Sequence, residues 1–239
     1  MTPTNATTVE TILVAQTTPG AEIAARLGLK PQRPLALVMG GAADLSAEDG
    51  ARLARQVHEG LGPALQVAGA AVIDGGTDAG IMGMLNAALG RIGFSGPYIG
   101  VAPAGVTYLP GELPNEDTYP FGLNHTHIVQ VEGQEFGDER EPMFSLAAYL
   151  ASGQRSLGIL VNGGKGTQKE ALENVRQGRE VVVLRGSGRL ADEIAAALDA
   201  PQQARPDIRQ LITLGRFTPF DLRNPPNFLL DYLARKLAA

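Results

Sequence analysis

Short apolar runs that lead directly into glycine restrict the fold of this sequence more than any other feature. Four such runs lead into Gly40-Gly41, Gly75-Gly76, Gly163-Gly164 and Gly186. They alternate with segments of helical spacing, which is the pattern of βα units around a parallel sheet buried on both faces. The sequence therefore predicts an α/β fold with a doubly wound, mainly parallel sheet and helices on both faces.

The same pattern gives the expected positions of the elements. Strands are predicted at Thr11–Ala15, Leu35–Met39, Ala70–Ile73, Tyr98–Ala102, His127–Glu132, Leu157–Val161, Val181–Leu184 and Ile208–Leu214. Helices are predicted from the capping pair Ser46 and Asp49 through Leu61, and near Gly80–Leu89, Pro142–Leu150, Gln168–Arg176 and Leu190–Leu198. A long loop is predicted over Pro103–Asn124. We expect one domain over residues 1–239, with an N-terminal βα extension at 1–33 and a C-terminal amphipathic helix within 223–239.

Charge and composition argue against several classes of protein. The formal net charge is −5 and no cluster of Lys and Arg is present, which argues against a nucleic-acid partner. The absence of cysteine excludes disulfides, thiolate catalysis and cysteine metal sites. No apolar run reaches the roughly 18 residues of a membrane span, and Met1–Val9 lacks the pattern of a signal peptide. We therefore expect a cytoplasmic protein.

The glycine-rich turns form a candidate anion site. In an open parallel sheet such turns meet at the carboxyl edge, where backbone N–H groups and helix N-termini favour a phosphate group. The glycines concerned are Gly40, Gly41, Gly75, Gly76, Gly80, Gly163, Gly164, Gly166, Gly186 and Gly188. The alternative is that each glycine only permits a tight βα turn. Four such turns at one edge favour a site for a nucleotide-type phosphate ligand.

Two common phosphate-binding motifs do not fit these loops. Gly164-Lys165-Gly166-Thr167 is not a Walker A loop, because Gly166 stands where Ser or Thr must follow the lysine. Gly186-Ser187-Gly188-Arg189 fits the start of the dinucleotide motif, but the acidic residue about twenty positions on, Asp207, precedes its predicted strand instead of ending it. The motifs therefore argue against an NTPase and give little support to a dinucleotide-dependent dehydrogenase.

Three segments together carry a family resemblance: Asp74–Met82 (DGGTDAGIM), Asn162–Glu170 (NGGKGTQKE) and Gly186–Asp192 (GSGRLAD). The first two resemble the paired glycine signatures of the SLOG superfamily, which includes the LOG phosphoribohydrolases. The third, with Leu123–His127 (LNHTH), resembles the LSDAT branch, found in the cytosolic N-terminal region of melastatin-type transient receptor potential channels. The resemblance covers about Leu35–Leu198.

The resemblance implies a Rossmann-like domain that binds or senses a nucleotide-derived phosphate ligand, such as ADP-ribose or a related NAD-derived nucleotide. In the channel relatives, residues that match Arg189 and Phe136 bind the ligand, although Phe136 lacks the phenol hydroxyl of its counterpart. A second ligand arginine of those relatives has no match here, since Met143 falls near its position. Besides the glycines, the predicted ligand-binding residues are Thr77, Met82, His125, His127, Phe136, Lys165, Thr167, Ser187 and Arg189. No cofactor is required beyond the nucleotide ligand.

The resemblance to LOG phosphoribohydrolases implies an alternative, enzymatic function. In those enzymes the glutamate that matches Glu170 and an upstream arginine, here Arg140, cleave the N-glycosidic bond of a nucleoside 5′-monophosphate. A carboxylate can stabilise oxocarbenium charge and orient water. This sequence has Glu141 where those enzymes have a lysine beside the arginine. Glu170 also has a structural interpretation, because Thr167-x-x-Glu170 fits a capping box at a helix N-terminus.

Two histidines complete the candidate site residues. His125 and His127 alternate along one predicted strand, but no third ligand stands at a suitable spacing, so no metal is expected. We expect both imidazoles beside the ligand cleft, where they can donate to phosphate or ribose. The resemblance implies a homodimer, to which Asn224–Leu237 could contribute. A third possibility is a scaffold protein whose site is vestigial.

Overall fold

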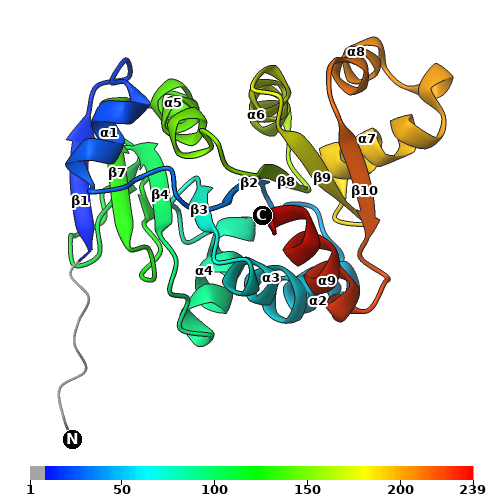
Figure 1. The fold of residues 1–239 in the computed structure, drawn as a ribbon, viewed down its shortest axis with the longest axis horizontal. Helices are drawn as coiled ribbons and strands as arrows, with labels where there is room; N and C mark the ends of the chain where they lie inside the picture. Colours follow the sequence, from blue (N-terminus) through cyan, green and yellow to red (C-terminus); the bar gives the residue numbers. More distant parts are fainter. Residues whose placement is uncertain (1–8, 239) are drawn as a thin grey trace, which may run out of the picture.

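The computed structural model describes residues 9–238, which form an eight-stranded sheet with helices on both faces (Figure 1). The strands are β1 (Glu10–Val14), β2 (Leu35–Gly40), β3 (Ala71–Asp74), β4 (Tyr98–Pro103), β7 (His127–Val131), β8 (Ser156–Val161), β9 (Glu180–Arg185) and β10 (Phe217–Asp221). Their order is β1-β7-β4-β3-β2-β8-β9-β10, and all neighbours are parallel. The predicted α/β fold with a mainly parallel sheet is confirmed.

The helices form two layers on opposite faces of the sheet. One layer contains α1 (Gly20–Arg26), α5 (Arg140–Leu150), α6 (Lys165–Arg176), α7 (Arg189–Asp199) and α8 (Pro206–Leu214), and the other contains α2 (Ala47–Gln56), α3 (Gly62–Val67), α4 (Gly80–Arg91) and α9 (Pro226–Leu237). A short 3-10 turn, Pro201–Gln203, lies between α7 and α8. Adjacent strand residues enter different cores, since Leu37 packs in the first layer and Val38 in the second. This alternation explains why the strands are apolar throughout.

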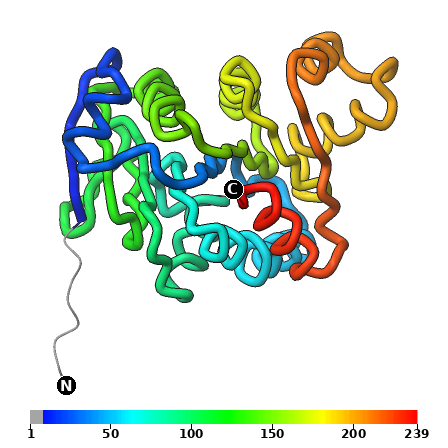
Figure 2. Tube along the Cα trace, viewed as in Figure 1, coloured from blue at the N-terminus to red at the C-terminus, as the bar shows by residue number. Residues whose placement is uncertain are grey.

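A continuous helical segment runs from α2 into α3. Ser46 caps it as predicted, because its hydroxyl oxygen accepts a hydrogen bond from the N–H of Asp49 at 3.1 Å. One turn of π-helix, Val57–Leu61, joins α2 to α3, so the predicted helix extends beyond Leu61. The C-terminal helix α9 packs against this segment through buried Leu229 and Leu233 (Figure 2). One face of α9 thus belongs to the core of this layer.

The strand predicted at Ile208–Leu214 is wrong, because these residues form most of α8. Ile208 and Leu211 are buried at a spacing of one helical turn, and Pro206 occupies the first turn, where its missing N–H costs nothing. The strand that the sequence interpretation missed is β10, which contains Pro219. Proline is tolerated in β10 because this strand lies at the edge of the sheet.

The predicted long loop over Pro103–Asn124 contains two short parallel strands, β5 (Thr107–Tyr108) and β6 (Tyr119–Pro120). Residues 1–8 and 239 lie outside the described part of the chain, and they include most of Met1–Val9 and the ends of the two predicted terminal segments. None of the helices described between residues 9 and 238 is long and apolar enough to cross a bilayer.

The chain order across the sheet creates one crevice at the centre. From β2 the chain continues to β3 and β4 on one side, whereas β8, β9 and β10 lie on the other side. The chain therefore leaves β2 and β3 toward one edge of the sheet and leaves β8 toward the other edge. The turns that follow these strands diverge between β2 and β8. In open α/β sheets, ligands bind at such a switch point.

Replacement of Gly40 by Ala is expected to destabilise the fold by about 2–4 kcal/mol. Gly40 ends β2 with φ +134°, and a Cβ atom there would lie 1.8 Å from the carbonyl oxygen of Val161 in β8. Thermal unfolding measures the loss. Gly50→Ala in α2 is the matched control, since a Cβ there meets nothing within 4 Å and alanine favours a helix. Equal melting temperatures for the two variants would contradict the prediction.

Candidate functional site

A pocket of about 350 Å³ lies at this switch point, and we call it the central pocket. Gly40 and Gly41 after β2 and Gly75 after β3 form part of its lining. α5 contributes Arg140, and α6 contributes Glu170. The volume is near the lower end of the roughly 300–1,000 Å³ found for small-molecule sites.

Two helix N-termini also face the central pocket. The first turn of α4 contributes Gly80 and Met82, and the first turn of α6 contributes Gly166 and Thr167. Thr77 lies between β3 and α4 and lines the same space. Helix N-termini present backbone N–H groups and the positive end of the helix dipole, so this end of the pocket favours an anion.

The capping-box interpretation of Thr167 and Glu170 is wrong, because α6 begins two residues before Thr167. The residue that caps the helix is Gly164, and the Thr167 hydroxyl accepts a hydrogen bond from its N–H at 3.4 Å. Glu170 is therefore one turn inside the helix, on the wall of the pocket. Capping of α6 therefore does not explain the Glu170 carboxylate on the wall of the central pocket.

The pKa of Glu170 is raised to about 7, first by burial and then by the negative charge of neighbouring Glu139, while Arg140 lowers it. Burial also raises the pKa of Glu139, whose carboxylate accepts a hydrogen bond from the N–H of Gly137 at 2.7 Å. Arg140 Nε is buried without a hydrogen-bond partner. Two carboxylates and one guanidinium thus share the pocket, and the charge of Glu170 changes near neutral pH.

Two aromatic rings form the mouth of the central pocket. Tyr119 and Phe136 both line it, with ring centroids 5.6 Å apart in an edge-to-face arrangement. About half of each side chain is exposed, 47% and 53% respectively. Exposed aromatic faces beside a polar pocket are suited to stacking on a planar base.

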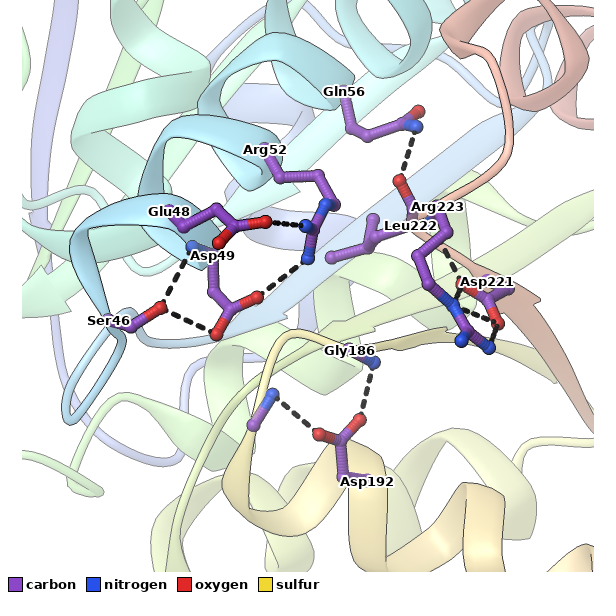
Figure 3. Close-up of polar contacts among 11 residues, drawn as sticks. Ser46, Glu48, Asp49, Arg52, Gln56, Gly186, Asp192, Asp221, Leu222 and Arg223 are labelled. Carbon is purple, nitrogen blue, oxygen red and sulfur yellow. Dashed lines mark hydrogen bonds and ion pairs between the residues drawn. The ribbon is translucent and has the colours of Figure 1, made fainter.

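The fourth glycine loop, Gly186–Gly188, does not line the central pocket. Its backbone donors are used internally, because the N–H groups of Gly186 and Gly188 both donate to the carboxylate of Asp192 in α7 (Figure 3). Ser187 is fully buried, with its hydroxyl donating to the carbonyl of Leu184. The N–H groups of Gly186 and Gly188 are therefore not free to bind a ligand. The loop also contacts the turn after β8, because the side-chain amide of Asn162 donates a hydrogen bond to the carbonyl oxygen of Ser187 at 2.7 Å.

Other predicted ligand residues lie on the other side of α6. Gly163, Gly164, Lys165 and Arg189 line a separate depression between α6, α7 and α8, which we call the lateral groove. Arg189 is exposed, and its nearest carboxylate partner is Asp44, at 3.7 Å. The predicted ligand residues are therefore divided between two depressions, and some line neither of them: Gly76, His125, His127, Gly186, Ser187 and Gly188.

Comparison with known families agrees with this fold. The sequence model of the family LSDAT_prok, described as SLOG in TRPM, prokaryote, matches residues 33–230. The chain belongs to this LSDAT family. The match begins just before β2 and ends within α9, so it includes every residue of the central pocket and the lateral groove. β1 and α1 precede the LSDAT match.

In this LSDAT chain, the two histidines lie outside the central pocket. His125 precedes β7 and is fully buried, with Nε2 3.0 Å from Asp74 Oδ1. His127 is the first residue of β7, at the end of the strand opposite the glycine turns, and burial lowers its pKa. Neither imidazole lines the central pocket, because both residues lie at the amino end of β7, whereas the pocket lies at the carboxyl ends of the strands.

Several pocket residues of the LSDAT chain were not among the predicted ones, chiefly Tyr119, Gly137 and Glu139. Tyr119 lies in the two-residue strand β6 and Gly137 in a turn, and both segments are too short to give a periodicity that would place them. Glu139 directly precedes Arg140, so a search for acidic neighbours of the candidate arginine would have found it. Among residues 9–238, no group of three His, Asp or Glu side chains is placed to hold a metal ion.

Proposed function

We propose that this LSDAT protein binds a nucleotide-derived phosphate ligand in the central pocket. One observation carries the proposal: the turns after β2 and β3, the first turns of α4 and α6, and Arg140 all line a single space at the switch point of the sheet. Backbone donors, helix dipoles and a guanidinium in one pocket complement a phosphate group. Family membership supports a nucleotide-related ligand.

The shape of the pocket supports a specific orientation. In the proposed orientation the phosphate lies at the helix N-termini, near Gly80 and Gly166. The base is placed at the mouth, against Tyr119 and Phe136. The pocket volume of about 350 Å³ favours a ligand with one nucleoside and one phosphate over larger members of the class. ADP-ribose and related NAD-derived nucleotides would extend beyond the mouth.

Cleavage of the N-glycosidic bond is a second candidate function, because Arg140 and Glu170 line the same pocket. In this reaction water adds to C1′, the bond from C1′ to the base nitrogen breaks, and the proton lost by water is transferred to the departing base. Glu170, with a pKa of about 7, can accept that proton from water near neutral pH. Arg140 can hold the phosphate that orients the ribose.

Gly166→Ala tests the site without disturbing the fold. Gly166 lines the central pocket in the first turn of α6, and a Cβ atom there meets nothing within 4 Å, so the methyl group fits the protein but intrudes into the ligand space. We expect at least about tenfold weaker binding of AMP by calorimetry, with an unchanged or higher melting temperature.

Gly50→Ala is again the control, because it adds the same methyl group to a helix away from the pocket. Unchanged AMP and ADP-ribose affinity in Gly166→Ala would contradict the proposed site. Chromatography of the same samples separates the two functions: binding without free base supports a binding protein, whereas release of adenine that stops in Glu170→Gln supports the hydrolase.

A further inference from the structure

The lateral groove is a large depression that the proposed function does not use. Its volume is about 1230 Å³, and it lies between α6, α7 and α8. α6 separates it from the central pocket: Gly166 and Glu170 line the pocket, whereas Lys165, Lys169 and Leu172 line the groove. The spacing of these last three residues is that of one helix face. The two depressions are thus on different faces of the same helix.

The rim of the groove carries an excess of positive charge. Five basic side chains line it, against two acidic ones, Glu193 and Asp207. Arg205 pairs with both acids, at 3.4 Å and 3.1 Å. Lys165 and Lys169 are exposed, and neither forms an ion pair within the part of the chain that the structure describes. This concentration of cations stands out in a chain with a net charge of −5.

Leucine side chains lie among these charges. Leu172 on α6 is partly buried, and Leu214 at the end of α8 is 56% exposed. The lining of the groove thus combines basic side chains with apolar surface that a ligand can cover.

We propose that the lateral groove is a second binding site, which takes a phosphomonoester with a long apolar chain. The phosphate is held by Lys165 and Lys169, and the chain lies over Leu172 and Leu214. Charge complementarity selects the anionic head group, and burial of the leucines selects the chain. The groove is larger than the central pocket and does not share its side chains, so this inference does not depend on the proposed nucleotide site.

The test compares three probes by calorimetry, each below its micelle concentration: dodecyl phosphate, inorganic phosphate and dodecyl maltoside. We expect saturable binding of dodecyl phosphate that is at least about tenfold tighter than binding of either other probe. Lys169→Glu and Leu214→Asp should each weaken it at least about tenfold. AMP should not displace dodecyl phosphate.

Two controls match the charge and the polarity changes. Lys30→Glu alters an exposed lysine remote from the groove, and Leu113→Asp alters a leucine that is 89% exposed in the Pro103–Asn124 loop. Both should bind dodecyl phosphate as the parent does. Equal affinity for dodecyl maltoside or for inorganic phosphate would overturn the inference, and so would tight binding that survives Lys169→Glu and Leu214→Asp.

Discussion

Asp74→Asn should lower the free energy of unfolding by about 2–4 kcal/mol, because it replaces a buried carboxylate that accepts hydrogen bonds from several buried groups. The carboxylate of Asp74 accepts hydrogen bonds from Tyr98 Oη at 2.6 Å, from His125 Nε2 at 3.0 Å and from the N–H of Gly76 at 2.8 Å. His125 Nδ1 lies 2.9 Å from the carbonyl oxygen of Gly122. Both ring nitrogens of His125 therefore lie within hydrogen-bond distance of oxygen acceptors, so the Asp74 carboxylate is one member of a buried polar network.

Urea unfolding with a comparison of midpoints and slopes measures this effect. Asp78→Asn is the control, because Asp78 is exposed in the turn that follows β3 and should change stability by less than about 0.5 kcal/mol. Burial, and then the charge of Asp74, raise the pKa of Tyr98 well above its usual value, so the phenol remains a neutral donor throughout the accessible pH range. A loss below about 1 kcal/mol in Asp74→Asn would show that the buried carboxylate contributes little.

Glu170→Gln should make the protein more stable at pH 8, by about 2–3 kcal/mol, and should have little effect at pH 5. Burial raises the pKa of Glu170 in the folded protein to about 7, above its ordinary value of 4.5. The folded state therefore binds the Glu170 proton more tightly than the unfolded state. The resulting stability is complete below pH 4.5 and is lost as the pH rises through 7.

Denaturant unfolding at both pH values measures this linkage. Glu173→Gln is a control on the same helix, because Glu173 lies outside the central pocket and pairs with Arg176. It should show no gain at pH 8. If Glu170→Gln is no more stable than the parent at pH 8, the carboxylate is better solvated than its position suggests. A higher free energy of unfolding for Glu170→Gln at pH 8 would mean that the charge of Glu170 destabilises the parent protein. Such a destabilising charge is expected of a functional group.

The fold could be predicted because its signals are local. Apolar runs followed by glycine mark parallel strands, and the turns after β2 and β3 were expected to share one edge of the sheet, where they lie. The exception is α8, whose short apolar run fits a strand or a helix equally well. Only packing decides between them, because Ile208 and Leu211 reach the core together as a helix face.

The site was harder to predict because it depends on side chains that are distant in sequence. Arg140 and Glu170 are thirty residues apart, and only the return of the chain to β8 brings them into one pocket. The sequence also shows the glycine loop Gly186–Gly188. It does not show that the N–H groups of Gly186 and Gly188 donate hydrogen bonds to Asp192 and so are not free to bind a ligand. His125 and His127 alternate in the sequence, yet a strand boundary between them places one in the core and the other at the far end of β7.

The walls and the mouth of the central pocket differ in how much sequence change they tolerate. At Gly40 a Cβ atom would lie 1.8 Å from the carbonyl oxygen of Val161 in β8, so this part of the wall tolerates little change. Tyr119 and Phe136 are half-exposed, so their substitution costs little stability. Descendants of this chain can therefore alter the mouth of the central pocket while the turn after β2 keeps its shape.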